Sequence, residues 1–203
     1  MTDRYQAFSD SPIGKLFVKN LGLPSPVKLD RWHEGAPTVA GNVVVGGNGR
    51  LGKSISDALD VLGVPVVSAA EAAKPDTDKV KGLVFDATAI TSADQLIALQ
   101  EFFTPLMRSL SSCARVVVLG TIANQTDSAA EQIAQRALEG FTRSLGKEIG
   151  KGSTVNLVYV AKGSEAAITS TLAFFLSPKS AYVSGQVVRI GDTGTKKAEA
   201  KAV

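Results

Sequence analysis

Residues 42–52 read NVVVGGNGRLG, and this stretch decides the fold. The run from Asn42 to Val45 is rich in β-branched residues, which is typical of a buried strand, and glycines follow it. Residues 50–62 then place four apolar side chains on one face of a predicted helix: Leu51, Ile55, Leu59 and Leu62. A strand, a glycine turn and an amphipathic helix in this order predict the first unit of an α/β domain.

The glycines of this turn follow the spacing G-x-G-x-x-G at Gly47, Gly49 and Gly52, with Arg50 among them. In dinucleotide-binding folds this spacing lets the backbone approach a pyrophosphate at the N-terminus of the helix. Such a site also needs an acid near the end of the second strand, and the nearest one here is Glu71. Two interpretations stay open: the glycines serve only a tight turn, or they also hold an anion or nucleotide.

Strand and helix patterns alternate from this turn to residue 190. Further strands are predicted at 64–67, 82–87, 115–119, 154–160 and 186–190, and helices at 92–111, 128–149 and 165–176. Continuous apolar strands separated by helices are typical of a parallel sheet with helices on both faces. We therefore expect three parts: an N-terminal arm with a short helix (1–40), a Rossmann-like α/β domain (41–191) and a flexible tail or linker (192–203).

Composition excludes several classes of function. The net charge of +3 is not concentrated in a basic run, so nucleic acid is not an expected partner. One cysteine, Cys113, and one histidine, His33, leave no disulfide and no expected metal site. No apolar stretch reaches the length of a membrane span or resembles a signal peptide, so a cytoplasmic protein is expected.

Two segments of the second half resemble a known enzyme family. Residues 137–148 read ALEGFTRSLGKE, and residues 175–188 read FLSPKSAYVSGQVV. They are similar to the helix after the catalytic residues, and to the C-terminal helix–loop–strand, of short-chain dehydrogenases/reductases of the 3-oxoacyl-acyl-carrier-protein reductase type. The resemblance covers roughly residues 41–191. It implies NADH or NADPH as the cofactor of the family.

The chain departs from this family at the positions that carry out its chemistry. Counted back from residues 138–141, the positions of the catalytic tyrosine and lysine hold Glu131 and Gln135, and the serine position holds Thr121. An ionised glutamate has no proton to give to a substrate oxygen, and glutamine supplies no positive charge. No catalytic residue is therefore expected, and the chain alone is expected to be inactive.

The chain is also shorter than the family. The segment between the second predicted strand and residue 82 leaves no room for the strand and helix that contact adenine in the family. This deletion predicts a three-layer Rossmann-like or flavodoxin-like sheet of five or six parallel strands in the order 2-1-3-4-5. Residues 46–52 contain no Ser or Thr to hold a flavin phosphate, which argues against flavin.

The arm, the shortened sheet and the degenerate reductase segments together resemble the N-terminal domain of the high-molecular-weight 3-oxoacyl-acyl-carrier-protein reductases. In that family a flavodoxin-like domain precedes an intact reductase domain. The resemblance implies a non-catalytic scaffold or dimerisation domain of a 3-oxoacyl-acyl-carrier-protein or 3-oxoacyl-CoA reductase in fatty-acid metabolism, without a cofactor of its own. The alternative is an active NAD(P)H-dependent short-chain reductase with altered catalytic groups.

The resemblance also implies partners: a second copy bound through helices 92–111 and 128–149, an intact reductase domain in cis or in trans, and an acyl carrier protein. The second of these helices carries three stripes. The first is mostly small (Ile133, Ala137, Gly140, Ser144), the second is the predicted core face (Ala134, Leu138, Phe141, Leu145), and the third is basic (Arg136, Arg143, Lys147). The basic stripe is either a solvated face or a docking surface for an acidic carrier protein.

Overall fold

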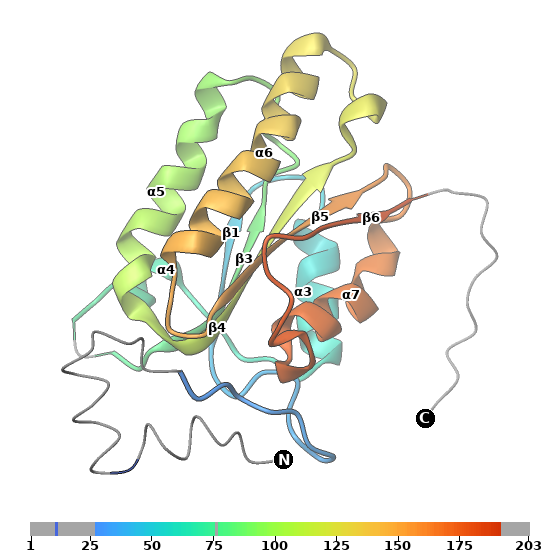
Figure 1. Ribbon diagram of the computed structural model, residues 1–203. Helices are drawn as coiled ribbons and strands as arrows, with labels where there is room; N and C mark the ends of the chain where they lie inside the picture. Colours follow the sequence, from blue (N-terminus) through green and yellow to red (C-terminus); the bar gives the residue numbers. More distant parts are fainter. Residues whose placement is uncertain (1–10, 12–26, 76, 192–203) are drawn as a thin grey trace.

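The computed structural model describes residue 11, residues 27–75 and residues 77–191 (Figure 1). In this part of the chain, six parallel strands form one sheet in the order β2-β1-β3-β4-β5-β6, with helices on both faces. The predicted three-layer α/β fold and its strand order are confirmed. The short helix predicted in the arm lies outside the described residues.

The sheet is built from apolar runs. The strands are β1 Val43–Gly47, β2 Val66–Val67, β3 Val80–Asp86, β4 Leu110–Thr121, β5 Thr154–Val160 and β6 Val187–Ile190. The middle strands are buried on both faces, which explains why they read as continuous apolar runs rather than as alternating ones. Strands β2 and β6 form the two edges and are only partly buried.

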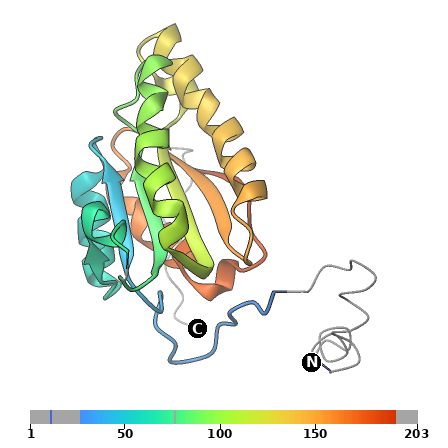
Figure 2. The same cartoon turned by 90° about the vertical axis from the view of Figure 1, so that its left-hand side faces the viewer.

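Helices α4 Ala69–Ala72, α5 Ile97–Leu106 and α6 Ala129–Glu148 cover one face of the sheet, and α3 Gly52–Val61 and α7 Ile168–Leu176 cover the other (Figures 1 and 2). The 3-10 turns are η1 Asp94–Leu96, η2 Met107–Ser109, η3 Ala123–Gln125, η4 Glu165–Ala167 and η5 Pro178–Ser180. Each face has its own apolar core. The small-residue connector after β2 holds only the single turn α4, and no strand of the described residues extends the sheet beyond the β2 edge.

The helix predicted at 92–111 is wrong at its C-terminal boundary. The α-helical part ends at Leu106, one residue after Pro105, which has no N–H to continue the helical ladder. Leu110 and Ser111 already belong to β4. Residues 110–114 of this strand were not predicted, because they are Ser-rich and Cys113 has a positive φ of 53°.

The described part of the arm, residues 27–40, packs against the domain. Asp30 forms an ion pair with Lys81 at 2.6 Å, and the ammonium group of Lys179 lies 4.4 Å from the centroid of the Trp32 ring. Cys113 is buried beneath this segment, as expected of a small core residue. None of the helices that the structure describes has the length and apolarity to cross a bilayer.

Candidate functional site

The glycine turn lies at the carboxyl end of β1, where its helix meets the end of β3. Gly47 is the register partner of Asp86, the last residue of β3. The Asp86 carboxylate accepts a hydrogen bond from the backbone N–H of Leu51 at 2.8 Å, directly before α3 begins. The side chain of Thr88 accepts the N–H of Arg50 at 2.9 Å and donates to Asp86 at 2.7 Å. The chain therefore places its own carboxylate at the helix N-terminus, where a negative charge is favoured.

Two glycines of the motif are required by this contact. A Cβ atom on Gly47 would overlap the carbonyl oxygen of Asp86, and the φ of Gly47 is +82°. A Cβ atom on Gly49 would overlap the hydroxyl of Thr88 and lie 2.5 Å from a carboxylate oxygen of Asp86. Gly52 has nothing within 4 Å of its Cβ position. The glycines of the motif thus allow the turn to pack closely against Asp86 and Thr88 of the same chain.

Arg50, the one cation of the motif, is engaged as well. Its guanidinium donates to the Glu165 carboxylate and to the carbonyl oxygen of Val160 at the end of β5. Hydrogen bonds to the backbone at Glu165 and Gly163 lower the pKa of the Glu165 carboxyl, and the charge of Arg50 lowers it further. Glu165 therefore stays ionised. Its negative charge neutralises the positive charge of Arg50, which would otherwise be available to a phosphate.

The hollow beside the glycine turn is acidic. It has a volume of about 590 Å³ and opens between Gly47 and α5. Asp86 and Glu101 are the acidic residues among its lining, the buried carboxylate of Asp86 accepting from Leu51 and Thr88, and no Lys, Arg or His lines it within the described chain. Phe102 fills the space against Gly46, where a Cβ atom would overlap its ring. This hollow would repel a pyrophosphate.

Gln135, at the lysine position of the reductases, is a structural cross-link. It is fully buried, its Oε1 accepts the N–H of Thr121 at 2.7 Å, and its Nε2 donates to the carbonyls of Ala87 at 2.9 Å and Ile90 at 2.8 Å. One side chain thus satisfies three backbone groups and ties α6 to the ends of β3 and β4. Thr121, at the serine position, is 1% exposed and is held by this bond.

Glu131, at the tyrosine position, belongs to the start of α6. The hydroxyl of Ser128 accepts the N–H of Glu131 at 3.1 Å, and the Glu131 carboxylate accepts the N–H of Asp127 at 3.3 Å. This is a capping box shifted by one residue, and it satisfies donors that the helix leaves unpaired. The three positions Thr121, Glu131 and Gln135 do lie together in the structure, but they contribute hydrogen bonds to the fold.

Tyr159 cannot take the place of the missing tyrosine. It is 1% exposed, and its hydroxyl donates to the carbonyl oxygen of Gln135 at 2.7 Å. Burial raises the pKa of Tyr159 to about 12, with a smaller contribution from Glu139. Its proton is committed to the backbone of α6, so Tyr159 is not an available acid.

Solved structures with the same architecture include several enzymes. A short-chain dehydrogenase/reductase from Serratia marcescens superposes with a TM-score of 0.61 at 17% identity, over 77% of this chain and 98% of that one. A short-chain dehydrogenase/reductase described as glucose/ribitol dehydrogenase, from Brucella melitensis, gives 0.58 at 16% identity, over 79% and 98%. BdcA in complex with NADPH gives 0.54 at 16% identity, over 77% and 95%.

The chain has the fold of the short-chain dehydrogenases/reductases. At these identities the likeness concerns the fold. No family model matches the sequence, and no curated protein matches it. The six-stranded sheet and the short connector α4 agree with the sheet predicted from the sequence.

Sequence reasoning missed the partner of the glycine turn. Asp86 closes a strand of apolar residues at the same edge as the turn, and a buried acid in that place was a usable indication. The pattern Ser128-x-x-Glu131 before a helix also predicts a capping box. Nothing in the sequence pointed to Arg189 on β6, which the fold brings toward α6. Among the described residues no three His, Cys, Asp or Glu side chains form a metal site.

Proposed function

We propose that this chain is a non-catalytic dimerisation scaffold of a cytoplasmic 3-oxoacyl-acyl-carrier-protein or 3-oxoacyl-CoA reductase of fatty-acid metabolism. It would act beside an intact reductase domain, in cis or in trans, and bind no dinucleotide itself. One observation supports this proposal most strongly: side chains of the chain itself hold the two positions where enzymes of this fold are expected to act. The Asp86 carboxylate accepts a hydrogen bond at the N-terminus of α3, and Gln135 stands at the lysine position and bonds to the backbone.

The alternative is an active NAD(P)H-dependent reductase with altered catalytic groups. Its support is the retained glycine spacing between β1 and α3, the presence of Thr121, and the NADPH bound by a protein of the same fold. Against it stand the acidic hollow beside the turn and the absence of a proton donor at Glu131. The two proposals differ most clearly in the affinity for NADH.

The proposed dimer surface is the outer face of α5 and α6. A groove of about 370 Å³ between the two helices is lined largely by apolar residues, among them Phe103, Met107, Phe141 and Leu145. Ala137, which also lines the groove, and its neighbours Gly140 and Ser144 are exposed, and nothing lies within 4 Å of the Cβ position of Gly140. Small residues allow a second helix to approach closely, and the groove offers apolar area to bury. A second copy of this chain would fit both features.

Ala137→Glu tests this surface. Two copies of the new carboxylate would meet near the dimer axis, so we expect the dissociation constant of the dimer to rise by about 100-fold or more. The control is Ser170→Glu, which adds the same carboxylate to an exposed position of α7 on the opposite face of the sheet. Sedimentation velocity at several concentrations measures both variants. A wild-type chain that stays monomeric, or a dimer that both variants weaken equally, would rule out this interface.

A basic stripe for an acyl carrier protein has less support. Arg136 and Arg143 both form ion pairs with Glu139, at 2.9 Å and 3.3 Å. The carboxylate of Glu139 therefore compensates part of the charge of the stripe. Lys147 lies in the last turn of α6, where a positive charge is favoured by the helix dipole. These contacts favour a solvated face.

A further inference from the structure

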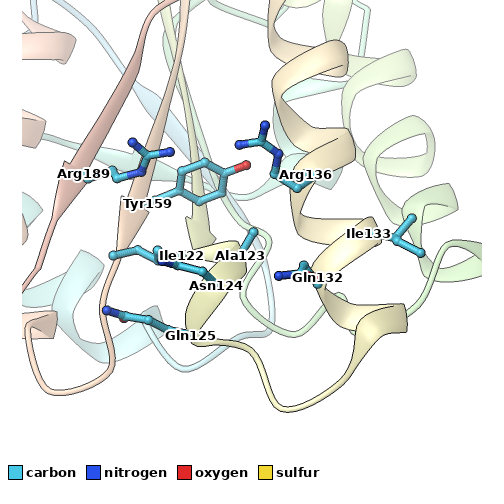
Figure 3. A pocket seen from close by; sticks show the side chains of 9 residues that line it. All are labelled: Ile122, Ala123, Asn124, Gln125, Gln132, Ile133, Arg136, Tyr159 and Arg189. Atoms are coloured by element: carbon cyan, nitrogen blue, oxygen red, sulfur yellow. The ribbon is translucent and has the colours of Figure 1, made fainter.

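A second hollow lies on the other flank of α6, away from the glycine turn. It has a volume of about 790 Å³ and opens between η3, the first turns of α6 and strands β5 and β6 (Figure 3). Its lining does not include Thr121, Glu131 or Gln135. Its volume falls within the range of about 300–1,000 Å³ that is usual for sites of small organic ligands.

Two guanidinium groups face this hollow. Arg189 on β6 is the register partner of Tyr159 on β5, so both side chains rise from the same face of the sheet. Arg136 reaches the hollow from α6, and Figure 3 shows the two arginines on either side of the Tyr159 ring. No carboxylate lines the hollow, and Arg189 forms no ion pair within the described chain.

Three carboxamides add further donors. Asn124, Gln125 and Gln132 line the hollow, and none of their side chains forms a hydrogen bond with another described residue. Each carboxamide can donate two N–H groups. The apolar lining residues are Ile122, Ala123, Ile133 and the almost fully buried Tyr159. The hollow therefore combines the guanidinium of Arg189, which is unpaired among the described residues, the guanidinium of Arg136, which also pairs with Glu139 at 2.9 Å, and several free donors with an apolar floor.

We propose that this hollow binds a phosphomonoester with an apolar or aromatic body. Arg136 and Arg189 hold the phosphate, and the carboxamides donate to its remaining oxygens, while the body lies against Ile122 and Ala123. A phosphate carries between one and a half and two negative charges near neutral pH, so it can accept from Arg189 and also compete with Glu139 for Arg136. A carboxylate, with one charge and two oxygens, would leave donors of this site unused. The site is separate from the proposed dimer surface and from the glycine turn.

Calorimetric titration of the whole chain with phenyl phosphate tests the proposal. We expect a dissociation constant below about 1 mM, and at least tenfold weaker binding by Arg189→Gln and by Arg136→Gln. The control is Arg143→Gln, which removes an arginine that also pairs with Glu139 but does not line the hollow. This control is expected to bind within about twofold of the wild type. Thermal unfolding of each variant checks the fold, and because Arg189 is exposed on an edge strand we expect Arg189→Gln to unfold as the wild type does.

Other ligands separate the alternatives. Inorganic phosphate should bind at least about threefold more weakly than phenyl phosphate, because it leaves the apolar floor uncovered, and benzoate should bind about tenfold more weakly. Absence of phenyl phosphate binding up to about 10 mM would overturn the proposal. Equal loss in Arg143→Gln would overturn it too, since it would indicate attraction to a basic face. Benzoate binding as tight as that of phenyl phosphate would replace the phosphate with a carboxylate.

Discussion

Gly47→Ala is expected to lower the free energy of unfolding by about 3–5 kcal/mol, although only one methyl group is added. The methyl group would overlap the carbonyl oxygen of Asp86, which is held in the sheet and cannot move away. In addition, the φ of +82° at Gly47 is unfavourable for any residue with a Cβ atom. The glycine is therefore required by the fold whether or not a nucleotide binds.

Gly52→Ala is the matched control for this prediction. Gly52 is the first residue of α3 and has open space at its Cβ position, so alanine should be neutral or stabilise by up to about 1 kcal/mol. Urea unfolding of both variants, followed by circular dichroism, gives the two changes. A Gly47→Ala variant within about 1 kcal/mol of the wild type would show that the contact with Asp86 is not tight.

Gln135→Lys introduces the residue that the reductases carry, and it is expected to destabilise the chain by about 3–5 kcal/mol. An ammonium group cannot accept the N–H of Thr121, and the position is fully buried. The buried positive charge would have only the carbonyls of Ala87 and Ile90 as partners. We therefore expect loss of stability and no gain of reductase activity.

Gln132→Lys, one turn earlier on the exposed side of α6, is the control for this substitution. Its side chain forms no hydrogen bond with another described residue, so the same change should alter stability by less than about 0.5 kcal/mol. Chemical denaturation of both variants measures the difference. A Gln135→Lys variant that is as stable as the wild type and reduces acetoacetyl thioesters would show that the position has kept a catalytic geometry.

The sheet was predictable because its middle strands are continuous apolar runs that are buried on both faces. Residues 154–160 were expected as a strand and form β5 with the same bounds. The strand order followed from the short segment between β2 and β3, which cannot hold another strand and helix. The start of β4 was not predictable, because a serine-rich segment with a left-handed Cys113 has no strand pattern.

The candidate site was predictable only in part. The sequence identified Glu131 and Gln135 as unable to perform the chemistry of the reductases, but it could not say what they do instead. Their roles depend on partners distant in the chain, such as the carbonyl of Ala87 for Gln135. The same holds for Asp86, which is 35 residues from Leu51 and meets it only because β1 and β3 are neighbours. Local patterns carry no information on such contacts.

We propose that the glycine turn serves the fold and holds no dinucleotide. Calorimetric titration of the wild-type chain with NADH tests it most directly, with Gly52→Glu as the second protein. That substitution has open space and puts a carboxylate in the first turn of α3, so it should preserve the fold while repelling a pyrophosphate. We expect both proteins to bind NADH more weakly than about 1 mM. A wild-type dissociation constant below about 10 μM, raised at least tenfold by Gly52→Glu, would contradict the scaffold and favour an active reductase.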